Sequence, residues 1–307
     1  MRLYQVDTAL FWDCTFSENS NNPTIIGTPS YSTALKLDSV TGGVLLDCDF
    51  VDNLSYGGGG PAINVGFASQ VVLMLSRFTN NAAVVAVNQQ PAMHPSLVGG
   101  AVRLDPGSRV SVIACNFTAN RALIGGAIHA ASGKSCTITS TSAVLEVDIG
   151  FFHTAGPGLG RIRWFSTSFP DLAARYMDTA EASAPSRFVG NAAVSGGAIA
   201  ASDIGTLQFS PDDKKANPYG DLPLTYMFNN TALSGGAVAV SRGSFYGTMS
   251  GIFIVLVHFD SNTAVPNQAE AAGLLQLLSL DWGSASSIAS TVGCGPGGGG
   301  ALCLVAT

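Results

Sequence analysis

The chain has 307 residues and a net charge of −6, and only 11% of its residues are charged whereas 47% are hydrophobic. Its few basic residues form no patch, so nucleic acid is not an expected partner. No stretch approaches the roughly 20 apolar residues of a membrane-spanning helix, so no membrane span is expected. Such a low charged fraction is unusual for a globular surface but suits a solenoid, whose outer faces can carry Gly, Ala and small apolar residues.

A strand pattern begins close to the N-terminus. Residues 1–4 lack the apolar stretch and cleavage site of a signal peptide, so none is expected in this chain. An alternating run then leads through Trp12 and Cys14 to Phe16, and Asn19 follows three residues later. The alternation predicts a short β-strand with one buried face.

The pairing of a Phe with an Asn three residues later recurs along the whole chain. The Phe slot holds Phe16, Phe50, Phe78, Phe117, Phe188, Met227 and Phe259, and the Asn slot holds Asn19, Asn53, Asn81, Asn120, Asn191, Asn230 and Asn262. In three copies a Gly-Gly-Ala begins five residues after the Asn. A repeat this regular indicates a solenoid built from like units.

The Ala of each unit opens a second short strand. The segments 34–37, 62–65 and 101–104 share this pattern, and each begins 16 residues before the next Phe slot. No segment predicts an obligatory crossover helix between units. We therefore expect an all-β fold, a single-stranded parallel β-helix with loop insertions, forming one domain over residues 1–307. Successive coils would pair in parallel at about 4.8 Å, and parallel connections favour the right-handed form.

In such a fold, like residues stack on like residues. Phe is expected to fill the interior, Ala to occupy the inner corner, and each Asn to bond to the amides above and below it. Asn also tolerates the left-handed backbone that a bend needs, so we expect this conformation at the Asn slot. The repeated residues are therefore predicted to be structural rather than ligand-binding.

The repeats differ mainly in their insertions, at about 84–98, 131–185, 203–223 and 265–298. The first and the last enter at the same turn and should project from the same edge of the solenoid. Within the last insertion, residues 269–278 are predicted to form a short helix.

The cysteines allow two interpretations. Cys14 and Cys48 each lie two residues before a Phe slot, as Cys115 does, so all three should face inward. Stacking of adjacent coils would bring Cys14 and Cys48 close enough for a disulfide. The alternative is a small, buried, reduced thiol. The remaining cysteines, Cys136, Cys294 and Cys303, lack metal-ligand spacing, so no metal and no cofactor is expected.

A catalytic interpretation depends on a few acidic residues. Polysaccharide lyases and hydrolases with β-helical folds cluster carboxylates on one face. Here the candidates are Asp47, Asp49 and Asp52, but the positions equivalent to Asp49 in the next coils hold Arg77 and Asn116. The histidines share no spacing of a triad or metal site; they are His94, His129, His153 and His258. We assign no catalytic residue.

Recognition by a loop on the rigid scaffold is the favoured alternative to catalysis. The longest insertion, 131–185, carries Trp164 beside Arg161 and Arg163. An aromatic ring flanked by two cations suits a sugar ring or a partner side chain. A surface loop that packs only on itself is the competing interpretation of these residues.

The combination of Phe-x-x-Asn with Gly-Gly-Ala-Ile or Gly-Gly-Ala-Val, over roughly residues 14–264, resembles the repeat of chlamydial polymorphic outer-membrane proteins. Those proteins display β-helical passenger regions on the cell surface. The resemblance implies a right-handed, non-catalytic adhesion module that is extracellular or on the cell surface, at the outer membrane if bacterial. Its partners would be host-cell, cell-wall or extracellular-matrix proteins or glycans.

Two features depart from that family, since the chain lacks a signal peptide and also lacks a final run of barrel-type strands. A fragment of a larger protein is therefore expected. The alternative functions are a carbohydrate-active enzyme of the pectin lyase-like fold and a structural spacer.

Overall fold

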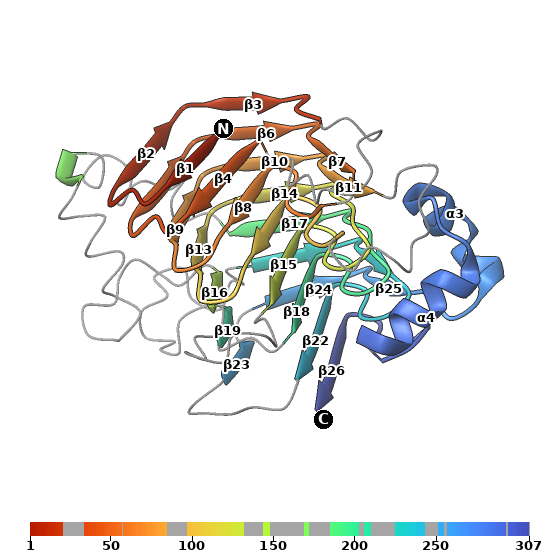
Figure 1. Ribbon diagram of the computed structural model, residues 1–307. Coiled ribbons are helices and arrows are strands. Elements are labelled where there is room, and N and C mark those ends of the chain that lie inside the picture. Colours follow the sequence, from red (N-terminus) through yellow and green to blue (C-terminus); the bar gives the residue numbers. More distant parts are fainter. Residues whose placement is uncertain are drawn as a thin grey trace.

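The computed structural model describes residues 1–20, 34–56, 58–84, 97–131, 144–147, 169–171, 185–202, 206–209, 225–242, 251–254, 257–292 and 294–306. The described residues form a parallel β-helix, as the repeat predicted (Figure 1). Its colours run from red to blue down the stack, because each coil follows its predecessor in sequence. Among the described residues, no helix is long and apolar enough to span a membrane.

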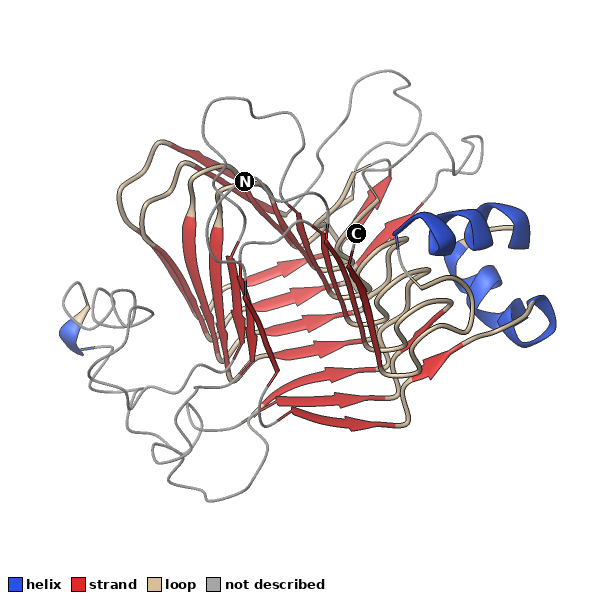
Figure 2. Ribbon diagram, turned by 90° about the horizontal axis from the view of Figure 1, so that it is seen from below, coloured by secondary structure: helices blue, strands red, loops and turns tan. Residues whose placement is uncertain are grey.

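Three long parallel sheets, which we name A, B and C, form the walls of the solenoid (Figure 2). Sheet A stacks β1 (Arg2–Tyr4), β4 (Leu35–Asp38), β8 (Ile63–Val65), β12 (Val102–Leu104), β15 (Ile128–Ala131), β18 (Ile199–Ser202), β22 (Val238–Arg242) and β26 (Leu302–Ala306). Sheet B stacks β2 (Ala9–Trp12), β5 (Gly43–Leu46), β9 (Gln70–Met74), β13 (Arg109–Ile113), β16 (Val144–Val147), β19 (Thr206–Phe209) and β23 (Gly251–Ile254). Sheet C stacks β3 (Thr15–Ser17), β6 (Asp49–Val51), β10 (Arg77–Thr79), β14 (Asn116–Thr118), β17 (Ser186–Val189), β20 (Thr225–Phe228) and β24 (Val257–Asp260).

Short pairs of strands and two helices complete the described elements. The strand pairs are β7 (Leu54–Tyr56) with β11 (Ala82–Val84), and β21 (Thr231–Ala232) with β25 (Thr263–Ala264). The helices are α3 (Gln268–Leu278) and α4 (Trp282–Val292). Each full coil thus passes through sheets A, B and C and returns through the turn that holds the Asn and Gly residues.

The register of sheet C pairs every Phe slot with the next one, from Phe16 to Phe259. Successive rings from Phe16 to Phe188 have centroids 4.7, 5.0, 4.6 and 4.7 Å apart, and their planes differ by at most 4°. These distances match the spacing of about 4.8 Å between strands, so the backbone sets the stacking. The rings fill the main core, where Phe50, Phe78, Phe117 and Phe188 are fully buried.

The Asn slot forms a continuous ladder from Asn19 to Asn262. In each step the side-chain Nδ2 donates to the Oδ1 of the next coil's Asn, at 2.8–3.1 Å. The backbone N–H of the same Asn donates to that Oδ1 as well. The second Nδ2 hydrogen bonds to the Phe-slot carbonyl of the preceding coil. Interior Asn side chains therefore use every donor and acceptor they have.

The left-handed backbone lies one residue earlier than we expected. Positive φ angles of 53–63° occur at the residue before each ladder Asn, namely Glu18, Asp52, Asn80, Ala119, Gly190, Asn229 and Ser261. The expectation that the Asn itself takes this conformation is wrong. The preceding residue makes the bend and varies in type, whereas the Asn is required for its amide.

The Gly-Gly turn needs both of its glycines, for different reasons. Gly125 has a φ of +67°, and a Cβ there would come within 2.2 Å of the Ile128 carbonyl oxygen. A Cβ on Gly126 would come within 2.0 Å of the Gly197 oxygen in the next coil. The first glycine thus permits the bend, and the second permits close stacking of coils.

The last insertion contains the predicted helix, as α3, and a second one that was not predicted. Helix α3 begins at the cap Asn267, whose side chain accepts a bond from the Glu270 N–H. Both helices lie outside the edge formed by the turns (Figures 1 and 2). Their buried residues, such as Leu274 and Ala285, form one apolar cluster with turn residues including Leu123 and Val194. The insertion therefore covers the coil edge rather than projecting freely from it.

The other predicted insertions need correction or lie outside the described residues. The interval 131–185 contains β16 and the interval 203–223 contains β19, and both strands pair within sheet B. Each interval therefore holds a strand of the solenoid as well as inserted chain. Of the interval 84–98, residues 85–96 lie outside the described residues.

Cys14 and Cys48 are free thiols, as the second of the two interpretations predicted. Cys115 is a free thiol as well. The Cys48 thiol donates to the Leu46 carbonyl at 3.4 Å, and burial raises its pKa to about 11. A disulfide that we did not predict joins Cys294 to Cys303, with 6.0 Å between their Cα atoms. Cys136 lies outside the described residues.

Candidate functional site

The residues first proposed for binding, Trp164, Arg161 and Arg163, lie outside the described residues, as do His94 and His153. Within the described part of the chain, side chains that a ligand can approach lie on the outer faces of the three sheets.

Of the acidic candidates, Asp47 and Asp49 lie at the turn between sheets B and C, whereas Asp52 follows the sheet C strand β6. Arg77 donates two hydrogen bonds to the Asp49 carboxylate, with 2.7 Å between Nη2 and Oδ2. These bonds, with smaller contributions from the charges of Asp47 and Asp13, raise the pKa of the Arg77 guanidinium. Asp52 instead accepts a bond from the Asn80 side chain. Within the described part of the chain, no group of three or more His, Cys, Asp or Glu residues has the arrangement of a metal site.

Sheet C presents an exposed outer face along its described length. One column of outward residues runs Asp49, Arg77, Asn116, Arg187, Tyr226 and His258 in adjacent strands. Most of these side chains are exposed, and Phe228 in the parallel column is 43% exposed. The rings of Tyr226 and His258 lie 5.5 Å apart. Ligands can therefore reach this face directly.

The Arg187 guanidinium is available on this face. In sheet C, Arg187 lies between Asn116 and Tyr226 of the two adjacent strands. It forms no ion pair with any described residue, whereas Arg77 is held by Asp49. An available cation next to an aromatic ring suits a carboxylate or sulfate group on a ligand.

Sheet B differs, because part of its outer face is apolar and buried. Val44, Leu46, Val72 and Met74 form a cluster there, against which Phe169 packs. At its rim Leu10 and Trp12 are 36% and 43% exposed. This part of the face is thus a second, smaller core rather than an open surface.

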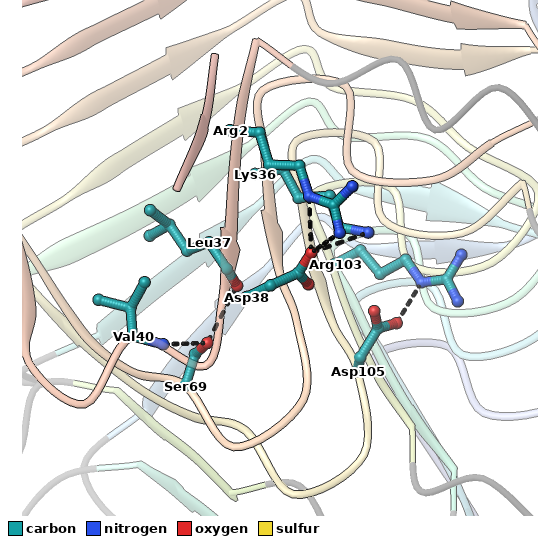
Figure 3. A network of polar contacts seen from close by, with 8 residues as sticks. All are labelled: Arg2, Lys36, Leu37, Asp38, Val40, Ser69, Arg103 and Asp105. Carbon is teal, nitrogen blue, oxygen red and sulfur yellow. Dashed lines mark hydrogen bonds and ion pairs between the residues drawn. The ribbon is translucent and has the colours of Figure 1, made fainter. Parts of the chain in front are cut away.

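Sheet A carries a row of polar residues on its outer face. Lys36, Asn64, Arg103 and His129 are paired one after another in adjacent strands. Figure 3 shows Arg2 and Lys36 converging on the Asp38 carboxylate, at 2.8 and 3.3 Å, with the Arg103–Asp105 pair beside them. In that second pair the Arg103 Nε lies 2.8 Å from an Asp105 oxygen. The charges of this row are therefore compensated locally.

Two members of the row are buried without hydrogen-bond partners. Asn64 is fully buried, and neither its Oδ1 nor its Nδ2 has a partner. His129 is 7% exposed, and its Nδ1 also lacks one. Burial, with a smaller contribution from the nearby Arg103 charge, lowers the pKa of His129 to about 3. The imidazole is therefore neutral at physiological pH.

Sequence reasoning missed this row, although a signal for it was present. Its four members stand two residues after Ala34, Ala62, Ala101 and Ala127, the residues that open the sheet A strands. Polar residues at one fixed offset in four consecutive repeats indicate a shared outer column. The alternation alone was interpreted as evidence for a strand.

Comparison of the chain with protein-family models, curated proteins and solved structures gave no significant match. The arrangement of side chains on the sheet faces therefore carries the functional argument.

Proposed function

We propose that this chain is a non-catalytic interaction module of the cell surface or extracellular space, which binds an extended glycan along the outer face of sheet C. The observation that carries the proposal is the contrast between the two sides of that sheet. Inward positions repeat Phe in nearly every coil, whereas the outward positions, most of them exposed, vary from Asp49 to Arg77, Asn116, Arg187 and Tyr226. A constant interior with a varied, reachable exterior is the arrangement expected of a recognition surface.

The chemistry of the face favours an acidic glycan over a neutral one. Arg187 supplies a cation, Asn116 supplies an amide, and Tyr226 and His258 supply rings on which a sugar can lie. Adjacent coils place these groups at intervals of about 4.8 Å, so a linear polymer can contact several coils at once.

Two further features support an extracellular location. The Phe-x-x-Asn and Gly-Gly-Ala units resemble those of chlamydial polymorphic outer-membrane proteins, which are surface-displayed. The Cys294–Cys303 disulfide also suits an oxidising compartment.

Polysaccharide cleavage is the second candidate, because the Arg77 guanidinium bonds to Asp49 and also feels the charges of Asp47 and Asp13. The Asp49 carboxylate, however, is held by Arg77 through two hydrogen bonds. A general acid or base must exchange protons with substrate, which this pairing opposes.

Binding is best tested with immobilised polysaccharides and a pair of matched arginine variants. The chain is passed over polygalacturonate, heparin and neutral xyloglucan, with a collagen surface to test for a protein partner. We expect binding to an acidic glycan that weakens with added salt. Arg187→Gln should weaken it about tenfold, or roughly 1.4 kcal/mol. Arg109→Gln, which changes an exposed arginine on sheet B, should leave it unchanged.

The same reagents decide between the alternatives. Equal loss of binding in Arg187→Gln and Arg109→Gln, or no binding to any acidic glycan, would contradict the proposal that sheet C is the binding face. Release of oligosaccharides that is abolished by Asp47→Ala with Asp49→Ala would establish the enzymatic alternative instead.

A further inference from the structure

The buried amide of Asn64 contrasts with every interior amide of the ladder. Asn81, Asn120 and Asn191 are as buried as Asn64, yet each uses all of its hydrogen-bonding groups. Asn64 uses neither of its side-chain polar atoms. Because a buried polar group without a partner destabilises the fold, its presence needs another explanation.

The fold itself does not require polar residues in this column of sheet A. In the next two coils the position of His129 is taken by Ala200 and Ala239. Both alanines are buried, at 4% and 2% exposure, within regular strands. A small apolar residue is therefore sufficient at this position, and Asn64 and His129 add polar groups that folding does not use.

The row lies in a largely buried part of sheet A. Asn64 and His129 lie on either side of Arg103 in adjacent strands, so about 10 Å separates the outer two along the solenoid. The side chains of Lys36 and Arg103 are only 19% and 20% exposed. Asp105 holds the Arg103 guanidinium in place from the side. The Arg103 guanidinium is thus positioned before any ligand arrives.

The charged side chains around the row are already engaged with one another. Lys36 is paired with Asp38 and Arg103 with Asp105, so the cations of the row are already compensated. Arg2 also contacts Asp38, so three cations share two carboxylates, and His129 adds no charge because it is neutral. An anionic ligand would meet cations that Asp38 and Asp105 already hold, so it would have to displace a carboxylate to pair with them directly.

The unpartnered atoms also specify the ligand's functional group. The Asn64 side chain needs a hydrogen-bond acceptor for Nδ2 and a donor for Oδ1. At Nδ1, the neutral imidazole of His129 needs a donor or an acceptor, according to its tautomer. A hydroxyl group both donates and accepts, so it satisfies each of these atoms. A carboxylate or phosphate only accepts, and would leave the Asn64 oxygen unpaired.

We propose that Asn64, Arg103 and His129 form a binding site for a small, neutral, polyhydroxylated molecule, of the class of simple sugars and polyols. The site lies on the outer face of sheet A, is separate from the proposed glycan surface on sheet C, and goes beyond the proposed function.

The test uses the whole chain with four defined probes, namely glycerol, glucose, galactose and galacturonate. Binding is measured by isothermal titration calorimetry, and stability by thermal unfolding. We expect saturable binding of at least one neutral probe, and at least tenfold weaker binding of galacturonate. Asn64→Leu and His129→Ala should each weaken the binding of the neutral probe at least tenfold. Arg109→Gln, which changes an exposed arginine on sheet B, should leave that binding unchanged.

Asn64→Leu also separates loss of the site from loss of the fold. If the amide is unpartnered in the unliganded protein, leucine removes an unsatisfied group and raises the melting temperature. A lower melting temperature would overturn the proposal, because it would show that the amide has a structural partner. Absence of binding by all neutral probes, unchanged binding in Asn64→Leu, or a crystal structure in which only water bridges Asn64 and His129 would overturn it as well.

Discussion

At the scale of single residues, the same side-chain type plays opposite roles in this chain. Asparagine in the ladder is a structural element because its neighbours above and below are also asparagines. Asparagine at position 64 has Lys36 and Arg103 as its neighbours, and its amide is left without partners. The surroundings in the adjacent coils, rather than the residue type, decide whether a buried amide supports the fold.

Asn120→Ala should therefore destabilise the protein strongly. Its Oδ1 accepts bonds from the N–H and Nδ2 of Asn81, and its Nδ2 donates to Phe78 and Asn191. Each group left buried without a partner costs about 1–3 kcal/mol. Urea denaturation should show this loss, with exposed Asn116→Ala as the unchanged control. Equal stability of Asn120→Ala and the parent chain would rule out an energetic role for the ladder.

His129 should make the protein sensitive to mild acid. Its pKa is about 3 in the folded chain, where burial opposes the charged form, against 6.5 for a free imidazole. As pH falls the unfolded state binds this proton first, so stability is complete above about pH 6.5 and declines toward pH 3. The decline from this residue is about 1.4 kcal/mol for each pH unit.

Urea unfolding between pH 7 and pH 4 measures that decline. His129→Ala should fold normally, because alanine occupies this column in the next coil. We expect its free energy of unfolding to depend less steeply on pH, by the uptake of about one proton on unfolding. His258→Ala, which removes an exposed histidine, should keep the parent profile. Identical slopes in the parent chain and His129→Ala would contradict the buried neutral imidazole.

At the scale of elements, inserted chain is secured to the solenoid at specific points. The disulfide connects Cys294, just after α4, to Cys303 in β26, and Ser234 Oγ accepts the Cys294 N–H. The helices between Val265 and this bridge pack on the coil edge through Leu274, Leu275 and Ala289. The insertion thus shields apolar turn residues that would otherwise face solvent.

The disulfide leads to a direct prediction. Peptide mapping without reducing agent should find Cys294 linked to Cys303, with Cys14, Cys48 and Cys115 as free thiols. Replacing both bridged cysteines with serine should lower stability by about 2–3 kcal/mol, the amount expected for so short a loop. Detection of a Cys14–Cys48 bridge instead would overturn the assignment.

Elements with a strong local pattern were predictable, and those defined by their neighbours were not. The helix over 269–278 was predicted from its Ala and Leu content, while the Ser- and Ala-rich α4 gives little local signal. The strands β16 and β19 lie within stretches that do not match the repeat. They become strands because β13 on one side and β23 on the other extend sheet B through them.

At the scale of the whole molecule, the interior was predictable and the exterior was not. Each coil must match the one below it, so the Phe and Asn slots and the register followed from spacing alone. No such constraint acts on outward side chains. Whether an outer face is open, as in sheet C, or covered, as in sheet B, depends on chain that packs from elsewhere. The candidate binding faces therefore emerged only from the structure, and the predicted residues around Trp164 remain a prediction.

The asparagine ladder gives the solenoid an electrical direction. Every bond between side-chain amides runs from Nδ2 of one coil to Oδ1 of the coil that follows it. The amide dipoles therefore add, much as peptide dipoles do along an α-helix. Among the described residues, nothing donates to the Oδ1 of Asn19, and Asn262 donates only to the Met227 carbonyl. The column is thus negative toward Asn19 and positive toward Asn262, and each amide polarises its neighbours within the low-dielectric interior.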